Sequence, residues 1–158
     1  MAIYLKNDKL KGSATDSNFK EQVELNSFQW GAGLGVSSAR GGDRTTSEPS
    51  VSEITFSKNT DKSSERFFKA LLKGDPVGQA EISFTAAVKG ESVAYLTIKL
   101  EDVIVSGYSI SHGGGSEMPS ESGSLNFTKF DWSFTGRDKE HGGSPTHLIY
   151  SLEENKVE

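Results

Sequence analysis

Cysteine is absent from the 158 residues of this chain. Its absence excludes disulfide bonds, a thiolate nucleophile and every zinc site that needs a cysteine ligand. Proline is scarce, with four residues, and no apolar run approaches the roughly 18 residues that a membrane-spanning helix needs. The chain must therefore be held together by an apolar core, and its length suffices for one domain over residues 1–158.

Basic charge is also in short supply. Seventeen Lys and Arg residues stand against 22 Asp and Glu, which gives a net charge of −5. Proteins that bind nucleic acid usually carry a basic surface, so we expect neither a nucleic-acid partner nor a membrane partner. Residues 1–8 lack the basic stretch and apolar run of a secretory signal. We therefore expect the protein to start in the cytoplasm, and its export would need other machinery.

Apolar and polar residues alternate along most of the chain, which is typical of half-buried strands. The alternating segments are residues 3–5, 23–30, 54–56, 81–88, 96–105, 125–127, 130–134 and 148–152. Within 23–30 the alternation changes phase near Ser27, which predicts a bulge or bend there. About eight strands favour a mainly β fold, either a compact β-barrel or a two-sheet sandwich.

Residues 61–74 break this pattern and predict one amphipathic α-helix that flanks the β structure. Its apolar side chains form one helical stripe: Phe67, Phe68, Leu71 and Leu72. Asp61 can accept free amides of the first turn, and Gly74 supplies a left-handed stop. Since Phe67 and Phe68 point about 100° apart, one narrow stripe cannot bury both. We expect Phe68, Leu71 and Leu72 to lie mainly in the core.

No chemical motif predicts an active site. The glycine-rich residues 31–36 lack the third glycine of a dinucleotide fingerprint, and no helix pattern follows them. The residues that could ligate a metal are His112, His141, His147, Asp138 and Glu140. Their spacing matches no known zinc pattern, and the chain has no nucleophile elbow. We therefore expect no catalytic residue, no metal and no cofactor.

Five segments follow one another in an order and with gaps that resemble a known family. They read IYLK with KGS in residues 3–13, VELNSFQWG in 23–31, ITFSK with DKSS in 54–64, YLTIKLEDVIVSGYS in 95–109 and ESGSLNF in 121–127. Together they resemble the Hcp family, the haemolysin-coregulated tube proteins of type VI secretion. Glu65 and Phe134 differ from the family's common Pro and Tyr, which leaves open a specialised paralogue.

This resemblance implies a β-barrel with one flanking helix that forms hexameric rings, which stack into a hollow tube without enzymatic activity. The implied partners are other copies of the chain, contractile sheath proteins, a VgrG-like spike and effector proteins that the tube carries. The implied route begins in the bacterial cytoplasm and ends in secretion without a signal peptide. Phe67 would then lie nearer a subunit boundary.

Two surfaces are candidate sites under this resemblance. Alternation places Phe28 and Trp30 on the core face of their strand, so that Ser27 and Gln29 face out of the barrel. The resemblance implies that this outer wall lines the channel and meets the effector. The glycine-rich residues 31–52 form a loop of unusual length, which is a common functional feature. The residues expected to contact an adjacent subunit or ring are Ser37, Arg40, Asp43, Arg44 and Glu48.

Two other classes of function stay open at this point. A stand-alone, monomeric β-barrel that binds a small ligand such as a sugar or a lipid would need a deep apolar pocket. A hydrolase on a β scaffold would need a convergent set of titratable groups, and the sequence shows none.

Overall fold

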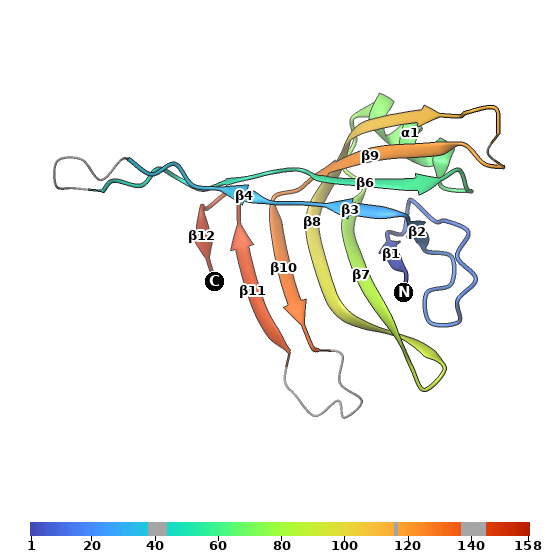
Figure 1. Cartoon of the computed structure of the whole chain (residues 1–158). Helices are drawn as coiled ribbons and strands as arrows, with labels where there is room; N and C mark the ends of the chain where they lie inside the picture. The colour runs from blue at the N-terminus through green and yellow to red at the C-terminus, as the bar shows by residue number, and fades with distance from the viewer. Residues whose placement is uncertain (38–43, 116, 137–144) are drawn as a thin grey trace.

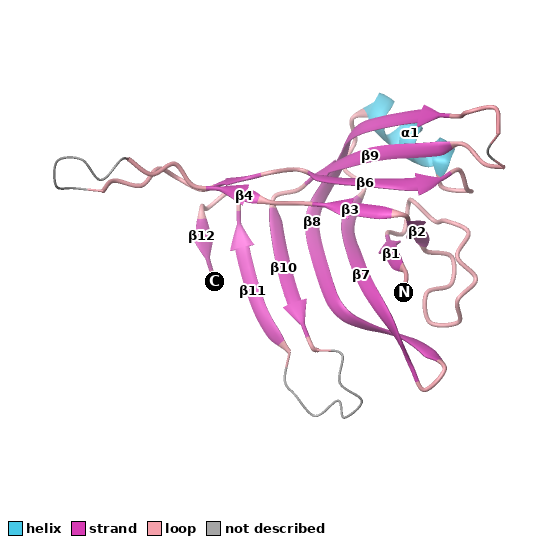
Figure 2. Ribbon diagram, in the orientation of Figure 1, coloured by secondary structure: helices cyan, strands magenta, loops and turns pink. Residues whose placement is uncertain are grey.

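The computed structural model describes residues 1–37, 44–115, 117–136 and 145–158, and most of them lie in strands (Figure 1). The elements in chain order are β1 (Ile3–Lys6), β2 (Val23–Leu25), β3 (Ser27–Gln29), β4 (Ala32–Gly33), β5 (Ser50–Val51), β6 (Ile54–Asn59), α1 (Ser64–Lys73), β7 (Gly78–Val88), β8 (Glu91–Ser111), β9 (Ser120–Asn126), β10 (Lys129–Phe134), β11 (Thr146–Ser151) and β12 (Lys156–Val157). The expected mainly β fold with one flanking helix is confirmed (Figure 2).

Two antiparallel sheets curve around one core and share a strand. The first sheet has the order β12-β11-β10-β8-β7-β1-β2, and the second has the order β3-β6-β9-β8. The N-terminal part of β8 pairs with β7 and β10, whereas its C-terminal part pairs with β9. Between the two parts, Asp102 adopts a left-handed φ of 50°, a conformation that Asp tolerates better than most residues. This bend allows one strand to serve both sheets.

The barrel closes where β2 ends and β3 begins. β2 pairs with β1 in the first sheet, and β3 pairs with β6 in the second. Asn26 lies between them, and its backbone N–H donates to the Ser57 carbonyl over 2.7 Å. The bend expected near Ser27 is therefore confirmed as a switch from one sheet to the other. The described residues hold twelve strands against about eight expected, because residues 23–30 form two strands, β2 and β3, and three further strands have only two residues: β4, β5 and β12.

The core lies between the two sheets. Its most deeply buried apolar residues come from seven elements: Leu5, Val23, Ile54, Phe67, Ile82, Val103 and Leu125. Aromatic rings extend this core toward β10, where Trp30 meets Phe130 edge to face with ring centroids 4.7 Å apart. The alternation seen in the sequence therefore marks the core side of each strand.

The helix α1 ends as expected, because Gly74 has a φ of 67° and its N–H donates to the carbonyls of Ala70 and Leu71. Near its start, Asp61 accepts the backbone N–H of Ser63 over 2.8 Å. These contacts set the limits of the helix close to those expected.

The expected orientation of the α1 side chains was wrong. Phe67 is fully buried and packs against Phe56 of β6, with ring centroids 5.5 Å apart. Phe68 is 47% exposed and Leu72 is 73% exposed, while Leu71 is half-buried. The side of the helix that faces the sheet carries Phe67 and the residues three and four positions later, Ala70 and Leu71. Phe68 and Leu72 each come one residue later and therefore lie on the adjoining side of the helix.

Candidate functional site

The outer face of the second sheet carries short, uncharged polar side chains on all four strands. Alternation sends Ile54, Phe56 and Lys58 of β6 inward and leaves their neighbours outside. We call the outward set the hydroxyl face. Its residues are Ser27, Gln29, Thr55, Ser57, Asn59, Ser106, Ser109, Ser111, Ser120, Ser122, Ser124 and Asn126. Ser57 and Ser124 are half-buried, and the other ten residues are exposed.

Register places serines of the hydroxyl face side by side. Ser27 lies opposite Ser57, Ser57 opposite Ser122, and Ser122 opposite Ser109, so one row of serines crosses all four strands. The Ser27 and Ser57 hydroxyls are 2.6 Å apart, and those of Ser109 and Ser122 are 2.5 Å apart. Such cross-strand pairs stabilise a sheet modestly, by about 0.2–1 kcal/mol each. Each hydroxyl keeps further donor or acceptor capacity for a ligand.

Glu53, a charged residue beside the hydroxyl face, is hydrogen-bonded by residues of that face. Glu53 accepts hydrogen bonds from Ser106 over 2.9 Å and from the side-chain amide of Asn126 over 3.3 Å. These bonds hold its carboxylate at the margin of the face. The result is a wide polar surface with almost no fixed charge.

Both outward residues expected from the sequence, Ser27 and Gln29, lie on the hydroxyl face. Phe28 points inward and meets Phe84 edge to face, with ring centroids 5.0 Å apart. The serines of β6, β8 and β9 were missed, although Ser recurs at every second position of residues 120–124 and 109–111. That recurrence was the available signal.

The described residues of the long glycine-rich segment, 31–37 and 44–52, form a narrow two-stranded ribbon that leaves the barrel, and we call them the arm (Figure 1). β4 pairs with β5, and farther out Val36 bridges to Thr46. At its base, the indole N–H of Trp30 donates to the Ser52 carbonyl over 3.0 Å. Of the predicted contact residues, Ser37, Arg44 and Glu48 are exposed, and Arg40 and Asp43 lie outside the described residues. The exposed Leu34 and Val36 add apolar surface to the arm.

A buried polar cluster joins α1 to the second sheet. The Lys58 ammonium lies 2.9 Å from an Asp61 carboxylate oxygen, 3.4 Å from Glu121 and 3.1 Å from the Ser64 hydroxyl. Ser64 donates to the other Glu121 oxygen over 2.6 Å. Burial and the neighbouring Glu121 raise the pKa of Tyr108 to about 12. Glu121 Oε1 has the Lys58 ion pair but no hydrogen bond within the described residues, and the other groups bond one another, which favours a structural role.

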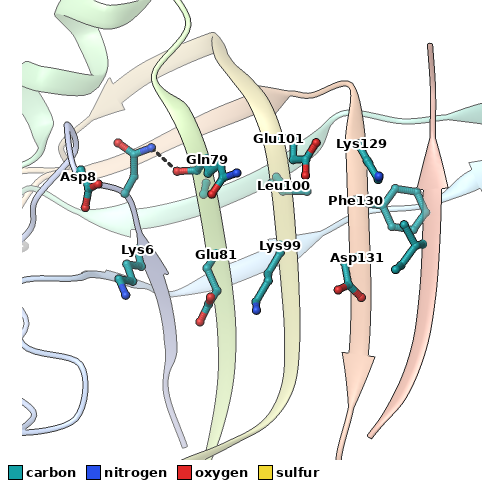
Figure 3. A pocket seen from close by; sticks show the side chains of 13 residues that line it. Lys6, Asp8, Gln79, Glu81, Lys99, Leu100, Glu101, Lys129, Phe130 and Asp131 are labelled. Carbon is teal, nitrogen blue, oxygen red and sulfur yellow. Dashed lines mark hydrogen bonds between the residues drawn. The ribbon is translucent and has the colours of Figure 1, made fainter. Parts of the chain in front are cut away.

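The outer face of the first sheet carries a shallow hollow with alternating charges (Figure 3). Register places Lys6 beside Glu81, Glu81 beside Lys99, and Lys99 beside Asp131. At its rim, the Asn7 side-chain amide donates to the Gln79 carbonyl over 2.8 Å. Because positive and negative groups alternate, the hollow does not concentrate charge of one sign.

The histidines form no metal site in the part of the chain that the structure describes, where no three His, Asp or Glu side chains cluster suitably. The ring Nδ1 of His147 lies 2.9 Å from Asp131, and His112 is exposed. The other residues that could have ligated a metal, His141, Asp138 and Glu140, lie outside the described residues. Within those residues, α1 is too short to cross a membrane, and no other helix could.

Comparison with known proteins gives one consistent result. Residues 4–134 match the family model described as type VI secretion system effector, Hcp. The protein hcp1 of Pseudomonas aeruginosa is 26% identical over 155 residues, which cover 97% of this chain and 96% of that protein.

Solved structures agree with this match. A structure of a type six secretion system protein is 27% identical, with a TM-score of 0.91 and 99% of each chain covered. The fold also matches Hcp1 from Salmonella typhimurium, at 24% identity and a TM-score of 0.80, over 99% of this chain and 97% of that one. With its barrel, flanking helix and arm, the chain belongs to the Hcp family, the tube proteins of type VI secretion.

Proposed function

We propose that six copies of this chain form a ring, that rings stack into a hollow tube, and that the hydroxyl face lines the channel. The hydroxyl face carries this proposal. Charged residues make up 25% of the whole chain, whereas all twelve residues of this face are uncharged. The family is structural and non-enzymatic, which fits a wall that contains no reactive constellation.

A channel wall of this chemistry suits a passing effector protein. Serine hydroxyls and the Gln29 amide can both donate and accept hydrogen bonds, so they can adapt to many polar surfaces. Because the wall has no fixed charges, it neither attracts nor repels cargo over long distances. Six copies of the serine row would repeat this surface around the channel. The tube would therefore hold an effector and still release it.

The arm would make contacts outside its own barrel. An isolated two-stranded ribbon is only marginally stable in water, and this one exposes Leu34 and Val36 along its length. A neighbouring subunit or ring that covers the arm would remove this apolar surface from water. Arg44 and Glu48, both exposed, offer charges of either sign for that contact.

The assembled tube would sit inside contractile sheath proteins, carry a VgrG-like spike at its tip and leave the bacterial cytoplasm by the type VI route. A monomeric barrel that binds a small ligand is less well supported, because the hollow in Figure 3 is shallow and lined with alternating charges. Size-exclusion chromatography with light scattering separates the two. The ring predicts about six times the 17.1 kDa chain mass, and the binding module predicts one.

A charge in the channel tests the role of the hydroxyl face. We expect Gln29→Glu to keep the ring and to lower the amount of effector that co-purifies with it, because a buried carboxylate in the cargo contact is costly to desolvate. Gln79→Glu is the matched control, since Gln79 is exposed on β7 of the first sheet. Equal effector levels in both variants would place cargo on another surface. A broken ring in Gln29→Glu alone would place Gln29 between subunits.

A further inference from the structure

The outer side of α1 carries an apolar patch that the fold leaves uncovered. Phe68 and Leu72 lie one turn apart on the same side of the helix, and both are exposed. The Phe68 ring stacks on Tyr108 of β8, with ring centroids 5.2 Å apart. Ile110, two residues farther along the same side of β8, is 55% exposed. We call Phe68, Leu72, Tyr108 and Ile110 the helix patch.

A second apolar patch lies on β10, β11 and β8, on the side that faces the core elsewhere in the first sheet. Trp132 and Phe134 are neighbours there, with ring centroids 6.2 Å apart. Leu148 lies opposite Trp132 and is 45% exposed, and Leu96 lies opposite Phe134. The first sheet has seven strands and the second has four, so this end of the first sheet extends past the core. We call Leu96, Trp132, Phe134 and Leu148 the sheet patch.

The two patches lie at different ends of the molecule. In Figure 1, α1 lies at the upper right beside β9, whereas β10 and β11 lie at the lower left. One copy therefore cannot bring its own patches together. Monomeric proteins seldom expose contiguous apolar surface unless it has a function, and this chain exposes it twice.

The helix that carries the helix patch and the C-terminal end that adjoins β11 have opposite charge balances. Three basic residues stand against one acidic residue along α1: Arg66, Lys69 and Lys73 against Glu65. The C-terminal end, which pairs through β12 with Tyr150 and Ser151 of β11, has the reverse balance, with Glu153, Glu154 and Glu158 against Lys156, and Glu158 already pairs with Lys129 over 3.1 Å. Pairing a helix patch with another helix patch would bring like charges together, whereas pairing it with a sheet patch brings opposite charges together.

We propose that the helix patch of one copy packs onto the sheet patch of the next copy. The inference rests on the proposed ring and assigns the residues that join its subunits. Two different patches on different sides of one molecule make a head-to-tail contact, and such contacts close into rings when the rotation between copies allows it. The exposed half of the α1 stripe is then buried by the neighbouring subunit, while Phe67 is buried by its own.

The absence of cysteine from the chain allows a direct test by cross-linking. We expect the double variant Leu72→Cys, Leu148→Cys to give a ladder of covalent products up to six chains with a short bifunctional maleimide. Either single variant should give no ladder, because its cysteine has no partner across the contact. The pair Leu72→Cys, Lys99→Cys is the matched control, since Lys99 lies on the other side of the first sheet.

Charge substitution tests the same contact without a cross-linker. We expect Leu72→Glu and Leu148→Glu each to lower the mass from about six chains to one, with the circular dichroism of the folded barrel unchanged. Leu72→Glu keeps an intact sheet patch, and Leu148→Glu keeps an intact helix patch. A mixture of the two variants should therefore form pairs of one chain of each kind and nothing larger. Two results would overturn the pairing of the patches: intact rings in both Glu variants, or wild-type-sized rings of the Leu72→Cys, Leu148→Cys variant that give no ladder. Either result would leave the proposed function standing. A wild-type mass of one chain would overturn the ring itself.

Discussion

Lys58 is a charged side chain held almost entirely away from water, and its environment explains how the barrel tolerates it. Its ammonium has two carboxylates, a hydroxyl and the Asn59 carbonyl as partners. Burying an ammonium without partners would be prohibitive, so the whole cluster must form together. The cluster therefore fixes the start of α1 against β6 and β9.

We expect Lys58→Met to lower the free energy of unfolding by about 3–5 kcal/mol, because it leaves Glu121 buried without its cation. The double variant Lys58→Met, Glu121→Leu should recover much of this loss, since it removes both charges. Urea denaturation of the two variants and of the wild type measures both effects. A double variant that is no more stable than Lys58→Met would show that the cluster contributes through something other than charge pairing.

Acid should weaken the same cluster. Burial by itself would raise the pKa of Glu121, but hydrogen bonds from Ser64, Thr60 and Tyr108 and the charge of Lys58 lower it overall. A carboxyl whose pKa is lowered on folding stabilises the protein above its ordinary value of 4.5, and this stabilisation is lost as the pH falls through the lowered pKa. We therefore expect the stability difference between wild type and Glu121→Gln to shrink below pH 4.5. A difference that stays constant down to about pH 3 would contradict this assignment.

At the scale of elements, strand positions followed from the sequence far better than the helix orientation did. Alternation needs only one strand, so Ser27 and Gln29 could be placed outside the barrel from residues 27–30 alone. A helix stripe with apolar residues at 67, 68, 71 and 72 has two possible core sides, and the choice depends on the surface it meets. Phe56 and Lys58 of β6, with Glu121 of β9, make that choice, and these three residues lie outside the helical pattern itself.

We expect Phe67→Ala to lower the free energy of unfolding by about 3–5 kcal/mol, as for other fully buried phenylalanines. Leu72→Ala is the matched control on the same helix and should change the stability of the isolated subunit by less than about 0.5 kcal/mol. Thermal or urea unfolding at a concentration where rings are dissociated measures both. Similar losses in the two variants would mean that Leu72 is buried within its own subunit.

The arm offers a separate prediction for this scale. Replacing residues 38–47 by a tight turn should leave the fold and the ring intact, because the described residues of this stretch, 44–47, are all exposed. It should shorten or abolish stacked tubes in negative-stain electron microscopy, since the arm is the proposed contact between rings. Tubes of normal length and yield would assign ring stacking to other surfaces.

At the scale of the whole molecule, the proposed role of the hydroxyl face as the channel wall predicts that cargo binding depends little on salt. Added salt shortens the range of charge interactions from about 10 Å at 0.1 M to about 3 Å at 1 M, but it hardly affects neutral hydrogen bonds. We expect the affinity of the ring for an effector to change less than about threefold across this range. Pull-down of the effector at several salt concentrations measures it. A loss of tenfold or more would show that charged residues bind the cargo.

The strand β8 also has a mechanical consequence. It belongs to both sheets, and the chain crosses again from β2 to β3 at Asn26. A thrust along the proposed tube that loads one sheet must reach the other sheet. It can pass through covalent backbone at these two places as well as through core contacts. The two β-sheets therefore resist sliding over each other, because the backbone connects them covalently. A subunit built this way can be pushed hard without coming apart between its layers.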